Sequence, residues 1–449
     1  MATTYLESDF TGTGASGPAI ATYSFWVKLE LSDDRATLVS GKDNGSYLKV
    51  RFADDGSGHY LGLYGSSMDM KSARLFRDPA AWYHVVMAFD TGQAAAADRI
   101  KVWINNEQIT DWPTDTRLAQ NDPLYLTKAD NVQIGAYNNT EHFDGIMAHV
   151  HCCDGTAYTP TDFAETDSTS GIWIPKTSPS VTYGSKGYFL KFASGAHGTD
   201  SSGNGNDFTV NGTMTNTKDT PENNFCTMSL ISSTTPTANP PVMSDGNLTL
   251  TDASSSGMDW GGYCTQAVTK GKWYWEVKNV EYNSNNVYHG LGQLNIQPIA
   301  SGSGSAGNFI YAFRIYNADG SVIIYGNGAT ESTSTTTVNG DIFGIKMDLD
   351  NGYWYLSKNG TFLNSGNAIN GTQIPTSDTT WYSPQQARHQ NTGDPNITSY
   401  NFGNGYFGTT AITTNSGAGY ADDAGEGKFN YTVPTGYYAL CTNNIATYG

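Results

Sequence analysis

The feature that most constrains the fold is a repeated pattern of short runs in which apolar and polar residues alternate. From 22 to 31, Tyr23, Phe25, Val27 and Leu29 alternate with polar residues, except that the apolar Trp26 occupies one of the polar positions. A period of two is that of a β-strand with one buried face, so we expect an outer-sheet strand here. Similar runs, bounded by Gly, Asp, Asn or Pro, lie at 47–52, 82–89, 99–104, 143–151, 273–277, 309–316, 322–325, 342–349, 353–356 and 437–441. The pattern predicts an all-β protein.

The composition supports many short strands joined by turns. The 449 residues include 50 Gly and 28 Tyr, and only 15% are charged. Long helices would need more Ala, Leu, Glu and Lys, and a chain of this length exceeds what a single core usually supports. We therefore expect two tandem antiparallel β-sandwiches of the concanavalin-like jelly-roll type, at 1–175 and 246–449. A Gly/Asn/Pro-rich connector should join them at 176–245, with an extended stretch at 234–241.

The charge and the cysteines exclude several classes of protein. A net charge of −18, with only 24 Lys and Arg, disfavours binding to nucleic acid or to anionic membranes. No apolar run approaches the roughly 18 residues of a spanning helix, and residues 1–5 do not resemble a signal peptide, so we expect a protein that is soluble where it is made. Five cysteines are an odd number, and we expect them to be reduced.

Five short motifs of the second half occur in the order seen in SPRY domains. They are Gly271-Lys272-Trp273-Tyr274-Trp275-Glu276-Val277, His289-Gly290-Leu291-Gly292, Gly340-Asp341-Ile342-Phe343-Gly344-Ile345, Asp348-Leu349-Asp350-Asn351-Gly352 and Ser357-Lys358-Asn359-Gly360. The region from 246 to 449 thus resembles a SPRY domain. The resemblance implies a bent antiparallel sandwich used for protein recognition, with no known catalysis.

The first half is similar to laminin-G-like and concanavalin-like sandwiches, from about residue 5 to residue 163. The similarity rests on Phe25-Trp26-Val27, Trp82-Tyr83-His84-Val85, Val102-Trp103-Ile104-Asn105 and Phe143-Asp144-Gly145-Ile146-Met147-Ala148-His149-Val150. Members of that superfamily often bind glycans, but no sugar-site motif of the family can be matched to residues of this chain.

The combination of the two domains resembles uncharacterised virion proteins of marine tailed bacteriophages. That resemblance implies a virion surface protein assembled in the host cytoplasm, with other virion proteins as partners and homo-oligomers as the usual state. The leading hypothesis is a tail- or fibre-associated adhesin that binds host surface glycan or protein. A purely structural decoration or connector protein is the alternative, and a glycan-active enzyme is a third, disfavoured one.

Exposed aromatic side chains are common platforms for sugars and for protein partners. Five aromatic residues fall in or near predicted loops, and we take them as candidate ligand-binding residues: Tyr60, Tyr64, Trp112, Tyr137 and Tyr406. Other aromatic residues lie inside strand patterns and are assigned to the core: Trp82, Trp103, Trp273 and Trp354.

Two clusters could hold metal ions. Asp200, Asn204, Asn206 and Asp207 supply hard oxygens on a glycine-permitted loop, which makes them a candidate calcium site, although Asx turns explain the same residues. The stretch from His149 to Cys153 contains imidazole and thiol groups that suit zinc, but no second ligand pair occurs at zinc-finger spacing. No other cofactor is expected.

No catalytic residues are predicted. A glucanase would need two carboxylates about 5 Å apart in one cleft. The nearest acidic pair, Asp348 and Asp350, has no glutamate beside it, and Asp350 is expected at a turn. Motifs of zinc proteases, serine hydrolases and phosphate-binding loops do not occur in the sequence.

Overall fold

The computed structural model describes residues 4–449 except 11–19, 31–34, 129–130, 230–240, 253–258, 284–285, 295–310, 316–319, 327–328, 370–373, 390–394 and 414–418. The chain divides into two compact units, Met1–Asn216 and Thr217–Gly449.

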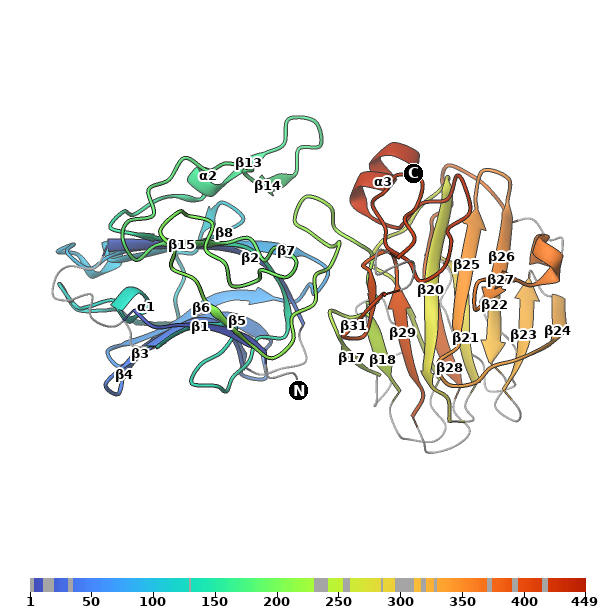
Figure 1. Ribbon diagram of the computed structural model, residues 1–449, viewed down its shortest axis with the longest axis horizontal. Helices are drawn as coiled ribbons and strands as arrows, with labels where there is room; N and C mark the ends of the chain where they lie inside the picture. The colour runs from blue at the N-terminus through green and yellow to red at the C-terminus, as the bar shows by residue number, and fades with distance from the viewer. Residues whose placement is uncertain are drawn as a thin grey trace. The chain divides into compact units, whose positions relative to one another are not determined.

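The first unit is a sandwich of two antiparallel sheets (Figure 1). In spatial order, the eight-stranded sheet contains β10 (Thr114–Thr116), β6 (Met68–Phe76), β5 (His59–Gly65), β4 (Ser46–Asp54), β3 (Arg35–Asp43), β11 (Asn131–Ile134), β1 (Tyr5–Ser8) and β16 (Thr209–Asn211). The six-stranded sheet contains β15 (Tyr188–Leu190), β12 (Gly145–Asp154), β2 (Ile20–Leu29), β7 (Trp82–Asp90), β8 (Ile100–Ile104) and β9 (Glu107–Gln108). Alternate side chains of both sheets, such as Phe25, Val50 and Leu63, form the core between them.

The expectation that residues 22–31 form an outer-sheet strand with one exposed face is wrong. β2 lies inside the six-stranded sheet, and both of its faces are buried. The outer face is covered by the segment that carries α2 (Pro160–Phe163), β13 (Ala164–Thr166) and β14 (Trp173–Pro175), as Figure 1 shows. Trp26 and Trp82 pack against Ala164 and Trp173 of this segment. Ser24, a polar residue of β2, is buried, and its hydroxyl group is hydrogen-bonded to His84 Nε2 at 2.8 Å.

Part of the region expected to be a connector belongs to the first sandwich. β15 pairs with β12, and β16 pairs with β1, so both extend sheets of the first unit. The division between the units falls at Asn216 and Thr217, inside the expected 176–245 connector. Most of the stretch at 234–241 lies outside the described residues.

The second unit is also a sandwich of two antiparallel sheets. The seven-stranded sheet contains, in order, β17 (Val242–Ser244), β18 (Thr249–Thr251), β29 (Ile397–Asn401), β20 (Lys272–Glu281), β25 (Ile342–Asp348), β26 (Tyr353–Lys358) and β27 (Thr361–Phe362). The six-stranded sheet contains β19 (Asp259–Tyr263), β28 (Tyr382–His389), β21 (Asn286–Gln293), β22 (Tyr311–Ile315), β23 (Ser321–Gly326) and β24 (Ala329–Thr336). Trp273, Trp275 and Trp354 lie in the core between the sheets.

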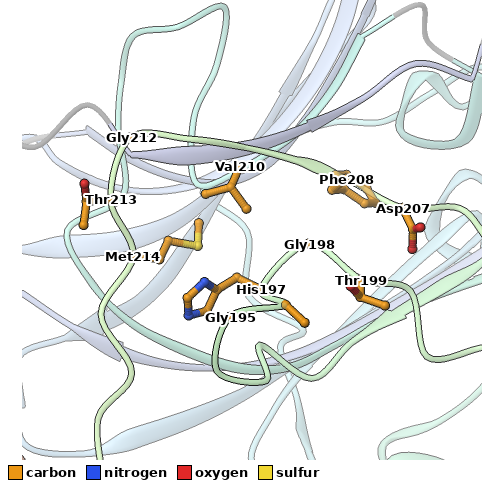
Figure 2. A pocket seen from close by; sticks show the side chains of 11 residues that line it. Gly195, His197, Gly198, Thr199, Asp207, Phe208, Val210, Gly212, Thr213 and Met214 are labelled. Carbon is orange, nitrogen blue, oxygen red and sulfur yellow. The ribbon is translucent and has the colours of Figure 1, made fainter. Parts of the chain in front are cut away.

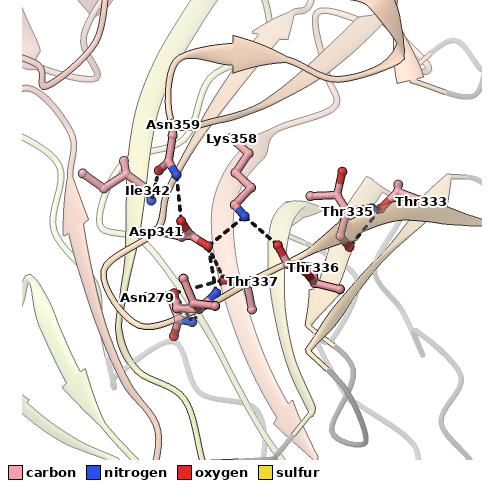
Figure 3. A network of polar contacts seen from close by, with 10 residues as sticks. Asn279, Thr333, Thr335, Thr336, Thr337, Asp341, Ile342, Lys358 and Asn359 are labelled. Atoms are coloured by element: carbon pink, nitrogen blue, oxygen red, sulfur yellow. Dashed lines mark hydrogen bonds and ion pairs between the residues drawn. The ribbon is translucent and has the colours of Figure 1, made fainter.

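The hairpin signal at Asn359 and Gly360 is confirmed, since both have positive φ and join β26 to β27. Figure 3 shows the polar network beside it. The Asn359 side chain accepts a hydrogen bond from the Ile342 N–H (2.9 Å) and donates one to Asp341 (2.7 Å). Lys358 forms an ion pair with Asp341 at 2.9 Å. The network fixes the start of β25 to the turn.

The strand expected at 437–441 is wrong. Tyr438 and Cys441 form only isolated bridges, to Trp273 and Phe225, and the chain then enters α3 (Thr442–Tyr448). The remaining short elements are η1 (Ala96–Asp98), α1 (Tyr125–Lys128), η2 (Asn364–Gly366), β30 (Tyr406–Phe407) and β31 (Thr410–Ala411). No helix in the described part of the chain is long and apolar enough to cross a membrane. The prediction of an all-β protein with two antiparallel sandwiches is confirmed.

Candidate functional site

The outer side of the eight-stranded sheet in the first unit is polar and rich in tyrosine. Its neighbouring strands place Tyr64 opposite Lys49, Lys49 opposite Ser40, and Tyr47 opposite Lys42. We call this surface the polar sheet face. It consists of Arg35, Thr37, Ser40, Lys42, Tyr47, Lys49, Arg51, Tyr60, Tyr64, Lys71, Asn131 and Gln133, with Tyr137 to Glu141 of the following loop.

Glu141 is the shared carboxylate partner of three cations at the centre of the polar sheet face. One of its carboxylate oxygens lies 2.7 Å from Lys49 Nζ and 2.9 Å from Arg51 Nη1, while the other lies 3.9 Å from Arg35. Burial alone would raise the pKa of Glu141, but the hydrogen bond and charge of Lys49, with Arg51, hold this pKa below its ordinary value. Glu141 is therefore the internal counter-ion of these cations.

The tyrosines of the polar sheet face are held by cations. The guanidinium of Arg51 lies 4.4 Å from the centre of the Tyr64 ring, and Lys71 Nζ lies 4.3 Å from the Tyr60 ring. The two hydroxyl groups are 3.0 Å apart. Burial raises the pKa of Tyr60 to about 12, so this hydroxyl stays protonated near neutral pH. These contacts define the orientation of the Tyr60 and Tyr64 rings.

A hollow of about 260 Å³ opens at one end of this face, and Ser40, Lys42, Asn44, Asn131 and Asn138 line it. Lys42 Nζ donates a hydrogen bond to Asn138 Oδ1 at 3.0 Å. Beside the hollow, the rings of Tyr47 and Tyr137 lie 5.2 Å apart between centres. The combination of amides, an ammonium, a hydroxyl and aromatic rings suits a polar ligand with apolar patches.

A second hollow of the first unit, about 490 Å³, lies between residues 195–199 and 207–214 (Figure 2). Phe208, Val210 and Met214 contribute apolar side chains to it. His197 is already hydrogen-bonded to Asn216 at 2.9 Å, and Asp207 accepts a hydrogen bond from the Asp200 N–H at 2.7 Å. The lining of this hollow carries His197 and Asp207 but no amide side chain, whereas three amide side chains line the first hollow.

The structure brings together three of the five candidate aromatic residues. Tyr60 and Tyr64 lie in β5 rather than in a loop, and Tyr137 lies on the same polar sheet face. Trp112 packs against the core and donates a hydrogen bond to the Ile109 carbonyl at 3.1 Å. Tyr406 belongs to β30 of the second unit and is 7% exposed.

The candidate calcium loop is closed by protein hydrogen bonds. Asp200 Oδ1 accepts from the N–H groups of Phe189 (2.9 Å) and Ser202 (2.8 Å), while Oδ2 accepts from the Ser202 hydroxyl (2.8 Å) and the Asn206 N–H (3.0 Å). The amides of Asn204 and Asn206 donate to the Gly187 carbonyl. An ion at this position would have to displace the donors that shape the loop.

The candidate zinc cluster is divided by a β-bulge between Ala148 and His151, where His149 has a φ of 49°. Cys152 faces the core, whereas His151 stacks on Phe189, with ring centres 3.9 Å apart. Among the described residues, no group of three His, Cys, Asp or Glu side chains could hold a metal ion.

The acidic pair considered for catalysis has structural partners. Asp348 pairs with Lys272 at 3.2 Å and accepts hydrogen bonds from Asn351. Asp350 accepts a hydrogen bond from the Gly271 N–H at 2.9 Å. Both carboxylates fix the turn after β25.

The sequence reasoning missed Lys42, Asn138 and Glu141. The Asn44 and Gly45 pair that follows Lys42 is a strong hairpin signal and could have placed Lys42 at the end of a strand. Asn138 contacts Lys42 and Glu141 contacts Lys49, and each pair is separated by about a hundred residues in the sequence. No local sequence pattern indicates contacts of this kind.

The first sandwich also resembles known proteins in sequence. Residues 4–162 match the family model of the concanavalin A-like lectin/glucanases superfamily. The matched segment includes the polar sheet face and its hollow. No curated protein sequence matches the chain.

Two solved structures similar to part of the chain are SPRY domains. The SPRY domain of human HERC1 is 16% identical, and the match covers 38% of this chain and 96% of that one, with a TM-score of 0.27. The PSpry domain of TRIM65 is 14% identical, and the match covers 39% of this chain and 89% of that one, also with a TM-score of 0.27.

Proposed function

We propose that this chain is a non-catalytic binding protein that recognises a glycan through the polar sheet face of its first unit. The observation that carries the proposal is the hollow around Lys42, with the Tyr47 and Tyr137 rings beside it. The similarity of this unit to the concanavalin A-like lectin/glucanases superfamily is in keeping with it.

The chemistry of the hollow matches a sugar. The amides of Asn44, Asn131 and Asn138 can donate to and accept from sugar hydroxyl groups. Aromatic rings offer apolar faces to the C–H groups of a sugar ring. Because Ser40, Lys42 and Asn131 stand on paired strands, their spacing is rigid before any ligand arrives.

The absence of catalysis is part of the proposal. Glu141 is neutralised by Lys49 and Arg51, and Asp348 and Asp350 are occupied by structural contacts. A glycosidase needs one carboxylate as acid and a second as base or nucleophile. The polar sheet face supports binding better than bond cleavage.

The setting we propose is the surface of a bacteriophage virion, with the protein acting as a tail- or fibre-associated adhesin on host glycan. The support is the resemblance of the two-domain sequence to phage virion proteins. In that setting we expect assembly in the host cytoplasm, other virion proteins as neighbours and a homo-oligomer.

A second candidate is a structural virion part that contacts only other virion proteins. One observation in the second unit favours it. Trp381 is 52% exposed, and its carbonyl accepts a hydrogen bond from the N–H of Leu294, which is 48% exposed. Exposed large apolar side chains held next to each other are typical of protein contacts.

A glycan array with the purified full chain tests the proposal, and Tyr137→Ala provides the site variant. We expect binding to at least one glycan class and about a tenfold loss of affinity in the variant, equivalent to about 1.4 kcal/mol. Tyr353→Ala, which removes a half-exposed tyrosine of the second unit, is the matched control and should bind normally. No glycan binding, combined with tight binding to purified virions, would favour the structural candidate.

A further inference from the structure

We infer that the hollow around Lys42 takes an acidic sugar, with the sugar carboxylate paired to the Lys42 ammonium. This inference rests on the proposed function and narrows its ligand to glycans that carry uronic or other sugar acids. Three features of the hollow carry it: the charge of Lys42, the neutral groups around it, and the rigidity of the two turns that frame it.

Lys42 is a cation of the polar sheet face that has no carboxylate partner among the described residues. Lys49, Arg51 and Arg35 each lie within ion-pair distance of Glu141, and Lys71 pairs with Asp55. Within the described residues, the side-chain partner of Lys42 is the neutral oxygen of Asn138. An ammonium without a counter-ion stands out in a chain whose net charge is −18. A carboxylate that replaces water there would gain a charge-assisted hydrogen bond.

The neutral groups complete a site for a sugar acid. The Asn138 oxygen accepts from Lys42, and no described residue accepts from the Asn138 NH₂ group, which remains available to a ligand oxygen. The Ser40 hydroxyl donates to the Ala136 carbonyl at 2.7 Å and can still accept from a sugar hydroxyl.

A carboxylate bonded to the lining residue Asn131 helps to orient the ligand. Asn131 Nδ2 donates to Glu7, which places a negative charge on the side of β11 and β1. A ligand carboxylate is therefore favoured toward Lys42 and Asn138, and sugar hydroxyl groups, which can donate, are favoured toward Asn131. The hollow thus has a positive end and an acceptor end.

Two tight turns hold the hollow in shape. Asn44 and Gly45 turn the β3–β4 hairpin with φ values of 45° and 86°, and Asn138 and Asn139 form a matching turn with φ values of 51° and 57°. The second turn is closed by mutual backbone hydrogen bonds between Tyr137 and Thr140.

The Asn138 turn is also bound to the sheet. Gln133 Nε2 donates to Asn139 Oδ1 at 2.7 Å, and the Gln133 side chain is fully buried. A ligand therefore meets a site whose polar groups are already ordered, which lowers the entropy cost of binding.

The test measures binding of uronate oligosaccharides and of their methyl esters to the full chain by calorimetry and on an array. Methyl esterification removes the charge and keeps the sugar ring, so the pair isolates the carboxylate. We expect the wild type to prefer at least one acid over its ester by about tenfold. Lys42→Gln should abolish the preference while it retains the affinity for the ester. Lys101→Gln, on the six-stranded sheet, is the control and should keep the preference.

The outcomes separate this inference from the proposed function. Equal binding of acids and esters by the wild type would leave glycan binding intact and overturn the carboxylate assignment. A preference that survives Lys42→Gln would also overturn it. Failure to bind any acidic or neutral glycan would overturn both. If Lys42→Gln unfolds, Asn138→Ala provides the second variant, and its expected effect is a partial loss of the same preference.

Discussion

Acidification from pH 7 to pH 5 should destabilise the first unit by about 2 kcal/mol or more and leave the second nearly unchanged. Two buried histidines of the first unit are the cause. Trp173 Nε1–H donates to His84 Nδ1 at 3.1 Å, so the proton of the neutral ring is on Nε2, 2.8 Å from Ser24 Oγ. Burial lowers the pKa of His84 to about 3 and lowers that of His151 well below its ordinary value.

The magnitude follows from proton linkage. An unfolded histidine with a pKa of 6.5 takes up nearly one proton between pH 7 and pH 5, whereas the buried native ring takes up almost none. The unfolded state gains about 2 kcal/mol for each such ring over this interval. The stability supplied by a lowered histidine pKa is present above the unfolded pKa and is lost as the pH falls toward the folded one. His84 alone gives about 2 kcal/mol, and His151, whose pKa is lowered by burial, acts in the same direction.

In the second unit, one buried group lowers and another raises the unfolding free energy on acidification. Burial lowers the pKa of His289 to about 3. Acidification from pH 7 to pH 5 therefore lowers the unfolding free energy of this unit by about 2 kcal/mol. Burial also raises the pKa of Glu276 from 4.5 to about 7, against hydrogen bonds from the N–H groups of Asn430 and Tyr431. A raised carboxyl pKa stabilises the native state as the pH falls below that pKa. The protonation of Glu276 therefore raises the unfolding free energy by about 2 kcal/mol between pH 7 and pH 5. The two contributions cancel.

Hydrogen–deuterium exchange of the full chain, followed by mass spectrometry, reports the opening free energy of each unit separately. Core peptides of the first unit should lose protection between pH 7 and pH 5, after correction for intrinsic exchange, while those of the second unit should not. His84→Gln should reduce the loss by about 2 kcal/mol, and His197→Gln, a half-exposed control, should not change it. Equal pH dependence in both units, or an unchanged loss in His84→Gln, would refute the reasoning.

Four further outcomes are expected. Glu141→Gln should lower the urea-unfolding free energy of the first unit by about 2–3 kcal/mol, because it leaves part-buried cations without a counter-ion. Gly62→Ala should lower the melting temperature, at a cost of about 1–3 kcal/mol, since the new Cβ would lie 2.4 Å from the Tyr64 ring. Asn359→Ala should destabilise the second unit by about 2–3 kcal/mol in urea through its two lost hydrogen bonds. Calcium added to chelated protein should leave the calorimetric melting temperature unchanged, because donors occupy both Asp200 oxygens; a rise of several degrees would contradict this.

The strands of both cores could be predicted from the sequence because their signal is local. The run at 47–52 became the centre of β4, and the run at 82–89 became β7, since alternation and flanking turn residues suffice for each. The Asn359 hairpin was predicted for the same reason. Where the signal depends on a distant segment, the prediction failed. No residue near β2 indicates that Ala164 and Trp173 pack over its outer face.

The candidate site could be predicted only in part. The aromatic residues Tyr60, Tyr64 and Tyr137 were selected as loop residues, yet two of them stand on a strand and face cations. The partners that define the site, Lys42 with Asn138 and Lys49 with Glu141, come together only in three dimensions. Spacing along the chain carries no information about such pairs.

Because β15 and β16 pair with strands of the first sandwich, they determine where the chain can be truncated to give an isolated first unit. A fragment ending at residue 175 would remove both strands and leave β12 and β1 as bare sheet edges with unpaired backbone groups. It would also remove Tyr183 and Phe189, which stack around His151. Bare edges of this kind recruit other chains and aggregate. A first unit prepared alone therefore has to extend to Asn216, and insolubility of the shorter fragment would reflect its boundary rather than an inability of the unit to fold.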